Sequence, residues 1–469
     1  MPSLQSELNR GWQMHQQQRI AEAEQIYRQV LAQAPQDANA WCYLGIALND
    51  QRRYQQAVEA YEKALVLDSQ FPIALNNLGN SLRYLGQIER ADDCFQKAID
   101  LKPDYFNAFK NRGTLHAWNG NYELALQHYS QALELSPNDA ELHRNLGVIF
   151  LLLGKFRKGW NEYRWRWQVG DLKRLAGIPV WDGSSLENKS IVLTAEQGLG
   201  DTLQFVRFAQ LLRQCGARTL VYCQPALLAL LQNSPQLGSA FPNNLSLNEL
   251  SPGQRFDFQC SLLDVADILN IDQNSIPGQS GYISPAEHLV GYWRCRLAPG
   301  SDQAFRVGIA WQGNPEHQAD MYRSVALSHF LPLSLLPGIQ LVNLQRGFGS
   351  EQAAKWAGRR LLELGPDLDT SSGAFMDTAA VMRSLDLVIS SDTSIAHLAG
   401  ALGVPTWIAL SYVPDWRWLL ERKDTPWYSS VRLFRQPTMG DWSSVFAAMC
   451  QRLAKCVERK SIDTYPIES

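Results

Sequence analysis

A loop in the second half of the chain places a carboxylate directly before a predicted helix. It reads TAEQGLGDTLQFVRFAQLL over residues 194–212, with Gly198 and Gly200 ahead of Asp201. Glycines before a helix can cradle a phosphate on free backbone N–H groups, whereas a carboxylate at the end of a strand can act as a general base. The dinucleotide-binding fingerprint needs a third glycine where this chain has Leu203, and the charge of Asp201 would repel an anion.

We therefore predict that Asp201 is a catalytic base at the carboxyl end of a strand, facing a cleft. Glu196 of the same loop is a second candidate for a catalytic carboxylate. The alternative is that Asp201 only caps its helix by accepting a backbone N–H group.

A second motif lies at residues 383–410, RSLDLVISSDTSIAHLAGALGVPTWIAL. An apolar strand ends there, and Asp392, Thr393 and Ser394 open a helix whose first-turn N–H groups are free to bind an anion. His397 lies one turn beyond Thr393 on the same face of the helix. The motif predicts an anion site, and the alternative is a well-capped helix with a histidine that only packs.

Three further loops add polar side chains after predicted strands. They read GIAWQGNPEHQADMYRS at 308–324, LQRG at 344–347 and SYVPDWRWLLERKDTPWY at 411–428. Arginine suits a diphosphate because its planar group forms two parallel hydrogen bonds, although most arginines are surface or structural residues. The candidates for ligand contact are Gln312, Asn314, His317, Arg323, Gln345, Asp415 and Arg417, with Arg346 and Trp416 as neighbours.

No metal site is expected. The D-x-D triplet of Asp367 and Asp369 resembles a pattern that holds a cation against phosphates, but any two acidic residues two apart match it. A helix N-terminus and arginines already neutralise a diphosphate, so we predict neither a metal requirement nor a cofactor.

Short apolar runs alternate with helical patterns after residue 190, which predicts parallel α/β sheets. The strand candidates are residues 190–195, 217–223, 256–260, 305–311, 339–345, 385–390 and 406–411. A loop-rich segment divides them, so we expect one lobe at 190–298, a second at 303–440 and a final helix at 441–460.

The first part of the chain follows a different pattern. Glycines recur every ~34 residues at 11, 45, 79, 113 and 147, the period of a helix-turn-helix repeat. Small residues follow at Ala23, Ala57, Ala91 and Ala125, and aromatic residues at Tyr27, Tyr61, Phe95 and Tyr129. About five units are predicted over 4–170, stacked into a superhelix with an inner groove, before a linker at 171–189.

Asparagines recur at the sixth position of three successive units. Asn77, Asn111 and Asn145 are expected to line the inner groove one unit apart. A carboxamide both donates and accepts hydrogen bonds, so it can hold the backbone of an extended peptide. The alternative is that these asparagines serve only helix packing.

The spacing of glycine, alanine and aromatic residues closely resembles the tetratricopeptide family over residues 4–170. DTSIAHLAGALGVP resembles the nucleotide-sugar motif of the heptosyltransferase-like glycosyltransferases, and GLGD resembles their acceptor-side motif. That resemblance implies the two-lobed GT-B fold of two Rossmann-like lobes. It assigns Asp201 as the base and Asp392, Thr393, Ser394 and His397 to the donor diphosphate, with Ser394 where the family usually has glycine.

The composition excludes other classes of function. The 469 residues carry a formal net charge of −3 without long runs of one sign, so nucleic acid and anionic membranes are not implied as partners. Apolar runs are too short for a membrane span or a secretory leader. The eight cysteines are scattered without metal spacing, and we expect a reduced, cytoplasmic protein.

These patterns together predict an inverting, metal-independent glycosyltransferase that uses a nucleotide diphosphate sugar. The acceptor hydroxyl is expected on a protein held by the repeats, while the donor base and sugar stay open. Two alternatives remain: an interaction scaffold with an inactive GT-B region, and a sugar-nucleotide epimerase of the same two-lobed architecture.

Overall fold

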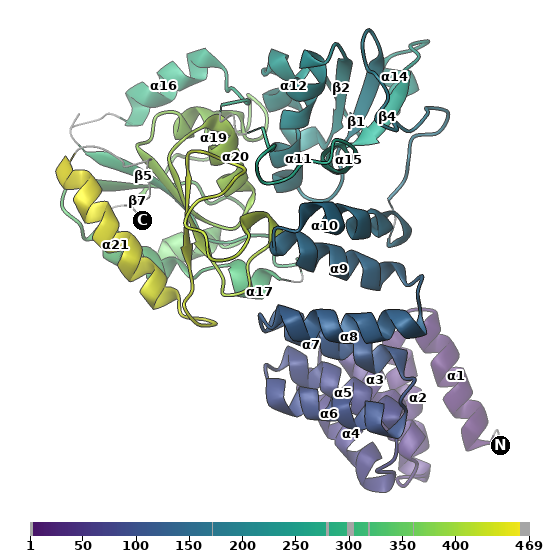
Figure 1. Ribbon diagram of the computed structural model, residues 1–469. Coiled ribbons are helices and arrows are strands. Elements are labelled where there is room, and N and C mark those ends of the chain that lie inside the picture. Colours follow the sequence, from purple (N-terminus) through teal and green to yellow (C-terminus); the bar gives the residue numbers. More distant parts are fainter. Residues whose placement is uncertain are drawn as a thin grey trace. The chain divides into compact units, whose positions relative to one another are not determined.

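The computed structural model describes residues 3–170, 172–277, 281–297, 304–317, 319–359 and 361–459. The chain forms two compact units, Met1–Ile149 and Phe150–Ser469. In Figure 1 the first unit is drawn in purple to blue and consists of helices, whereas the second carries the sheets. The division falls inside one helix, before the boundary at residue 170 that the repeat pattern predicts.

The first unit is built from pairs of antiparallel helices, the first of each pair with 13 residues and the second with 14. Its helices are α1 (Leu4–Gln16), α2 (Ile20–Gln33), α3 (Ala38–Asp50), α4 (Tyr54–Leu67), α5 (Pro72–Tyr84), α6 (Ile88–Leu101), α7 (Phe106–Trp118) and α8 (Tyr122–Leu135). Helix α9 (Ala140–Leu152) begins in this unit. Loops of a few residues join the helices, as antiparallel neighbours require.

The repeated glycines and aromatic residues pack against each other within each pair. A Cβ atom on Gly11, Gly45, Gly79 or Gly113 would lie 2.5, 2.5, 2.7 or 2.5 Å from a ring carbon of Tyr27, Tyr61, Phe95 or Tyr129. The four repeated alanines are fully buried. The 34-residue spacing therefore records where two helices touch so closely that no side chain fits between them.

The second unit begins with α10 (Phe156–Tyr163) and the short 3-10 helix η1 (Arg164–Gln168). A sheet in the order β3-β2-β1-β4 follows, built from β1 (Ser190–Thr194), β2 (Arg218–Cys223), β3 (Ser239–Pro242) and β4 (Phe258–Ser261). Its helices are α11 (Leu199–Phe205), α12 (Arg207–Gln214), α13 (Leu228–Gln232), α14 (Leu247–Leu250) and α15 (Leu262–Ile268), with η2 (Pro225–Leu227) and η3 (Pro235–Leu237).

A second sheet in the order β10-β9-β8-β5-β6-β7 completes the unit. Its strands are β5 (Phe305–Ala310), β6 (Ile339–Asn343), β7 (Leu361–Leu362), β8 (Leu387–Ser391), β9 (Thr406–Leu410) and β10 (Val431–Arg435). Its helices are α16 (Glu287–Leu297), α17 (Asp320–Arg323), α18 (Leu331–Ser334), α19 (Met376–Met382), α20 (Ser394–Leu402) and α21 (Trp442–Arg459), with η4 (Leu327–Phe330), η5 (Ser350–Lys355) and η6 (Trp416–Trp418). Helix α21 packs on one face of this sheet through Phe446 and Met449, which join a core with Trp407 and Trp311.

All strand pairs among the described residues are parallel, which confirms the α/β interpretation of this region. Each of the seven strand candidates contains a strand, and β3, β7 and β10 are additional edge strands. Residues 171, 303 and 460, at the ends of the expected linker, second lobe and final helix, lie outside the described residues.

The strand order reverses once in each sheet, beside β1 in the first and between β5 and β8 in the second. Ligands of parallel sheets bind at the carboxyl ends of the strands next to such a reversal. The loops after β1, β5 and β8 are the ones that carry most of the candidate site residues.

Within the part of the chain that the structure describes, we find no helix with the length and apolar character needed to cross a bilayer.

Candidate functional site

Asp201 lies in the first turn of α11 and uses its two carboxylate oxygens for different partners. Oδ2 accepts the backbone N–H of Gly198 at 2.8 Å, so Asp201 does cap its helix. Oδ1 accepts a hydrogen bond from Nη2 of Arg417, which follows β9 in the second sheet. The capping role and a place facing the second sheet are therefore both present.

Arg417 connects carboxylates from the two sheets. Its Nη1 donates to Asp415 Oδ1 at 2.8 Å, while its Nη2 is bound to Asp201. The guanidinium lies 4.3 Å from the ring centroid of Trp416, and the residue is 6% exposed. Burial acts to lower the pKa of Arg417, but Asp201 and Asp415 outweigh it and raise that pKa, so the cation is permanent.

The start of α20 lies beside this ion pair. Thr393 has the extended backbone of an N-cap residue, and its Oγ1 is 3.2 Å from Ser390 Oγ. His397 Nδ1 is 2.9 Å from the Tyr428 hydroxyl, and Nε2 is 4.0 Å from Asp392 Oδ1. Asp392, Thr393 and His397 are all buried and lie close together, and anion binding by this motif stays a prediction.

The structure shows why residue 200 of the GLGD loop is a glycine. A Cβ atom at this position would lie 2.8 Å from Cδ2 of His397. Helix α11, which follows β1, therefore approaches α20, which follows β8, at a distance that only glycine allows. The glycine serves the contact between the two sheet regions rather than a phosphate cradle.

The titratable groups here have shifted pKa values. Burial, with the charge of Asp415 adding to it, raises the pKa of the Asp392 carboxyl to about 6. Burial, with the charge of Arg417 adding to it, lowers the pKa of His397 to about 3, so this histidine is neutral at pH 7. Burial raises the pKa of Asp201 even though Arg417 opposes the shift. Such shifts cluster at functional sites.

The loop after β5 brings Arg323 to the same group. Burial has the largest effect on the pKa values of Asp392 and His397, and the charge of Arg323 acts on both as well. Arg323 Nε is 3.3 Å from Asp320 Oδ1. Partial burial of the His317 ring, with the charge of Arg323 adding to it, lowers the pKa of this histidine.

Gln312 and Asn314 hold the same loop in shape. Gln312 Oε1 accepts from Gln352 at 3.0 Å, and Asn314 Oδ1 accepts the backbone N–H of Glu316 at 3.0 Å. Asn314 is exposed. Both residues lie on the loop expected for the donor, and their ligand contacts stay predictions.

Gln345 does not have the free carboxamide that the sequence suggests. Its Oε1 accepts the backbone N–H groups of Trp311 and Gln312 at 2.8 and 3.0 Å. Its Nε2 donates to the carbonyls of Gln312 and Phe348 at 2.9 and 2.7 Å. The side chain ties the ends of β5 and β6 together, which argues against a role in ligand contact.

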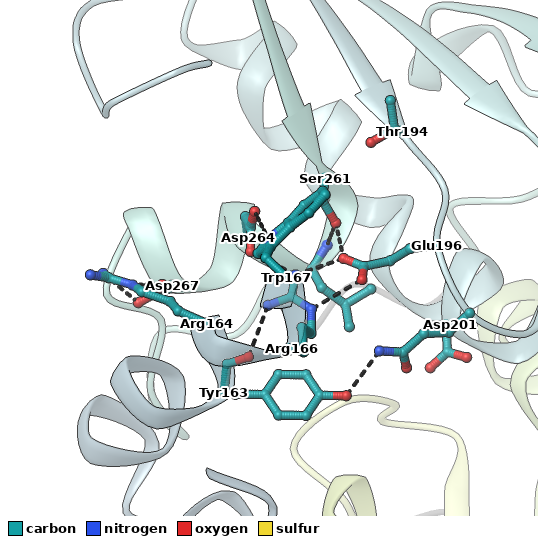
Figure 2. Close-up of polar contacts among 12 residues, drawn as sticks. Tyr163, Arg164, Arg166, Trp167, Thr194, Glu196, Asp201, Ser261, Asp264 and Asp267 are labelled. Carbon is teal, nitrogen blue, oxygen red and sulfur yellow. Dashed lines mark hydrogen bonds and ion pairs between the residues drawn. The ribbon is translucent and has the colours of Figure 1, made fainter. Parts of the chain in front are cut away.

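The carboxylate of Glu196 is likewise bound by neighbouring side chains (Figure 2). Arg166 of η1 donates to its two oxygens at 2.6 and 3.0 Å, and Ser261 donates to Oε1. Arg166 also binds Asp264 at 2.6 Å, and Glu196 is 7% exposed. A carboxylate with both oxygens bonded and no open side is poorly placed to take a proton, which argues against Glu196 as a catalytic base.

Sequence reasoning missed the residues that hold this loop. Arg166 reaches Glu196, and Tyr163 Oη accepts from Gln197 Nε2 at 2.9 Å. Gln197 has a left-handed backbone with φ of 63°, a conformation costly for a side chain other than glycine. The aromatic and basic segment GWNEYRWRWQ at 159–168 was the available signal, although nothing in it names its partners.

One of the two aspartates in the D-x-D triplet also has a structural role. Asp369 accepts the backbone N–H of Thr378 at 3.0 Å and its hydroxyl, and so caps α19. In the described ranges, no three histidine, cysteine, aspartate or glutamate side chains group closely enough to hold a metal ion. The expectation of a metal-independent reaction stays a prediction.

The three repeat asparagines lie on α5, α7 and α9 and are partly exposed. Asn76 links two of them: it donates to Asn77 Oδ1 at 3.2 Å and accepts from Asn111 at 2.9 Å. Asn145 accepts from Arg144 at 3.1 Å. Part of their hydrogen-bonding capacity therefore goes to neighbours, and peptide binding through them stays a prediction.

Known protein families account for the first unit. Tetratricopeptide repeat models match residues 16–72 and 72–105, and a further repeat model of that type matches 115–154. The N-terminal region carries tetratricopeptide repeats. The first and second helices of each pair are the helix-turn-helix units of this repeat.

Similarity to individual proteins is more distant. The chain is 26% identical over 334 residues to Protein FlbA of Caulobacter vibrioides, which covers 65% of this chain and 53% of that protein. It thus spans about half the length of this curated relative. The crystal structure of MamA (21% identity, TM-score 0.31) matches 34% of the chain and 92% of that protein. The crystal structure of a thermophilic repeat protein from Thermus thermophilus (20% identity, TM-score 0.33) matches 35% of the chain and 91% of that protein.

Proposed function

We propose that the second unit is a GT-B glycosyltransferase that moves a sugar from a nucleotide diphosphate donor to an acceptor hydroxyl. The observation that carries the proposal is the meeting of Asp201, after β1, with Arg417 and the start of α20, after β9 and β8. A potential base from one sheet thus lies beside an anion-binding helix end and arginines from the other.

In the proposed reaction, the donor diphosphate binds at the N-terminus of α20 with Arg323 and Arg417 as its cationic partners. The acceptor oxygen attacks the anomeric carbon, its proton passes to Asp201, and the bond from that carbon to the diphosphate oxygen breaks. The nucleoside diphosphate leaves with the bonding electrons, and the configuration inverts. Preorganised donors stabilise the charge that develops on this leaving group.

Arg417 has a particular task in this scheme. Without donor, it neutralises Asp201 and Asp415. A diphosphate is a stronger partner for a guanidinium than a single carboxylate because it offers two charges and paired oxygens. Transfer of Arg417 to the donor would free Asp201 Oδ1 for the acceptor, so that the base becomes available only when the donor is bound.

The test is a panel of nucleoside diphosphates and their sugars, measured by thermal shift and by product analysis. A true donor at 100 times its dissociation constant should stabilise the protein by about 2.7 kcal/mol, and transfer should require an acceptor. The proposal fails if no nucleoside diphosphate binds and no nucleotide sugar is hydrolysed or transferred. Conversion of free donor without an acceptor would instead indicate an epimerase.

One observation favours a scaffold whose second unit is inactive. Both oxygens of Asp201 are already engaged, by Gly198 and by Arg417, which would suit a purely structural contact between the sheet regions. The tetratricopeptide repeats suggest a protein-interaction role in either case. Donor binding without any turnover, even with acceptor protein from the native source, would support this alternative.

A further inference from the structure

A cavity of about 640 Å³ lies beside η1 in the second unit. Residues of η1, of the segment before β1 and of α15 line it. Asp201, Arg417 and His397 are not among the described residues of its lining. Pockets for small molecules commonly have volumes of about 300–1,000 Å³. The cavity therefore has the size of a ligand site, and the proposed transfer reaction does not use it.

The segment before β1 forms one wall of this cavity and is fixed to the first sheet. Gln259 of β4 is buried, and its Oε1 accepts the backbone N–H of Leu175 at 2.7 Å. Its Nε2 donates to the carbonyls of Leu175 and Ile178 at 2.6 Å. Val180 pairs with Gln259 in a parallel bridge. Arg174 and Val180, which both line the cavity, are thus next to or part of fixed backbone, and the wall is preformed.

The acidic side chains of the cavity already have cationic partners (Figure 2). Asp264 accepts hydrogen bonds from Arg166 at 2.6 Å and from Trp167 at 3.0 Å. Asp267 binds Arg164 through both of its oxygens. Since each carboxylate has a guanidinium partner, these two aspartates leave no unpaired negative charge in the cavity.

Arg174 is the cation that these pairs leave over. It is exposed and forms no ion pair with another residue in the part of the chain that the structure describes. Its guanidinium carbon lies 5.1 Å from the ring centroid of Trp167, and the hydrogen bond to Asp264 holds that indole in place. A guanidinium beside a ring keeps N–H groups free at its edge, where a planar anion can bind through two parallel hydrogen bonds.

The remaining lining of the cavity is mostly apolar. Leu172, Val180 and Ile268 contribute to it, with Gln168 as a neutral polar neighbour. Val180 is exposed, so part of this apolar surface faces water. A ligand that matches the whole cavity has one negative charge for the guanidinium and an apolar body for the aliphatic side chains.

We propose that this cavity binds a small organic carboxylate. The carboxylate accepts two parallel hydrogen bonds from Arg174, and the apolar body of the molecule lies against Leu172, Val180 and Ile268. A phosphate monoester fits less well, because it carries about −1.5 to −2 charges at pH 7 and the cavity offers one unpaired positive charge. The site is separate from the Asp201–Arg417 group, so it does not depend on the transferase proposal.

The binding test uses the full chain and three probes: phenylacetate, phenylacetamide and phenyl phosphate. Ligand-observed NMR titrations measure their dissociation constants. Phenylacetate should bind at least about fivefold more tightly than its neutral amide, the scale of a paired contact with an exposed arginine, and more tightly than phenyl phosphate. The proposal is overturned if phenylacetate does not bind, if it binds no better than the amide, or if phenyl phosphate binds more tightly.

Arg174→Gln should remove the preference for the acid over the amide, because glutamine keeps a donor but not the charge. The matched control is Lys173→Gln, which removes the same charge from an exposed neighbour that does not line the cavity, and this variant should keep the preference. A preference that persists in Arg174→Gln would place the binding at another cation, such as Arg323 or Arg417, and overturn the proposal. Loss of the preference in both variants would do so as well.

A second pair of variants tests the cavity wall opposite the charge. Because Val180 is exposed, a longer side chain there should leave the core and the melting temperature unchanged. Val180→Glu brings a carboxylate of the protein itself into the cavity, so it should weaken phenylacetate binding at least about fivefold relative to Val180→Gln, which has the same shape without the charge. Equal dissociation constants of the two variants would show that phenylacetate binds outside this cavity.

Discussion

Arg166 and Arg417 are two buried arginines of the second unit, and each one bridges two carboxylates. Arg166 binds Glu196 and Asp264, which are both associated with the first sheet. Trp167 donates to the remaining oxygen of Asp264, and Ser261 adds a second donor to Oε1 of Glu196. Arg417 binds Asp201 and Asp415, one from each sheet. The first cluster is closed by its own partners (Figure 2), whereas the second joins the two sheets, and in the proposed reaction the donor takes Arg417 away from Asp201.

The two arginines also differ in how exposed their carboxylate partners are and in the pKa values of the groups nearby. The side chains of Glu196 and Asp264 are 4% and 15% exposed, while those of Asp201 and Asp415 are 16% and 39% exposed, so the difference lies in Glu196 and Asp415. Only the Arg417 cluster lies beside a carboxyl whose pKa is raised to about 6 and a histidine whose pKa is lowered to about 3. A network in which every charge is paired can serve the fold alone, whereas titratable groups with shifted pKa values indicate a functional site.

The largest expected effect comes from Asp201→Asn. Asparagine has a single acceptor oxygen, so it can keep the helix cap at Gly198 only by losing the charged contact with Arg417, and the melting temperature should fall by several degrees. Turnover should fall by about two to four orders of magnitude, because a general base is lost, while donor binding is retained. The measurements are kcat, donor Kd by calorimetry and a melting curve.

Weakened donor binding by Asp201→Asn would show instead that the loop after β1 belongs to a phosphate site. Unchanged turnover would remove Asp201 from the chemistry altogether and leave it as a structural contact. Either result would contradict the assignment of a catalytic role to the Arg417 cluster and a structural role to the Arg166 cluster.

Arg166→Met should have the largest effect on stability. It leaves the buried Glu196 and the half-buried Asp264 without their cation, and breaking a buried pair typically costs about 3–5 kcal/mol. Arg417→Met should cost less stability, because Asp415 is more exposed than either partner of Arg166, but should weaken donor binding more. Chemical denaturation of the two variants, followed at the second unit, gives the comparison.

The double variant Arg166→Met, Glu196→Gln is the control for that prediction. Neutralising Glu196 removes one unpaired charge, so the double variant should be more stable than Arg166→Met alone. A loss in Arg166→Met smaller than that in Arg417→Met would contradict the division into a structural and a functional cluster.

Gly200→Ala tests how closely the two sheet regions must approach. A methyl group 2.8 Å from the ring of His397 forces α11 and α20 apart, and such overpacking typically costs about 1–3 kcal/mol. We expect lower stability and lower turnover, since Asp201 is the next residue. Gly198→Ala is the matched control, because the nearest atom to its added Cβ is the Asp201 carboxylate at 3.2 Å. Equal stability of both variants would contradict the role assigned to Gly200.

The sequence predicted the repeats and the central strands, because both leave periodic marks. Glycines such as Gly79 and aromatic residues such as Phe95 recur at a fixed spacing, because the aromatic ring fills the space that a side chain at the glycine would need. Strands β3, β7 and β10 were missed because they are edge strands of which half or fewer of the residues are buried, whereas the edge strand β4, which was predicted, is buried at three of its four residues. An edge strand is buried on fewer sides, so its apolar pattern is weaker.

The candidate site was predictable only in part for a related reason. The DTSIAH segment is contiguous in sequence, so its grouping of Asp392 with His397 could be read directly. The partners of Glu196, and all those of Gln345 except Phe348, are 30 residues or more away along the chain, and no local pattern encodes them. Arg166 and Arg417 look alike in sequence, each within a tryptophan-rich segment, and only their acidic partners distinguish them.

The smallest expected effect concerns the pH dependence of stability at Asp392. Its pKa is raised by burial to about 6 in the folded protein, against about 3.9 in an unfolded chain. The neutral carboxyl thus favours folding fully below pH 4, and this contribution is lost as the pH rises through 6. Asp392→Asn stays neutral throughout, so it should match the unmodified protein near pH 4 and exceed it at pH 7 by on the order of 1 kcal/mol. Melting curves from pH 4 to pH 8 provide the measurement, and a variant less stable at pH 7 would show that the charged carboxylate is well paired, as Glu196 is with Arg166.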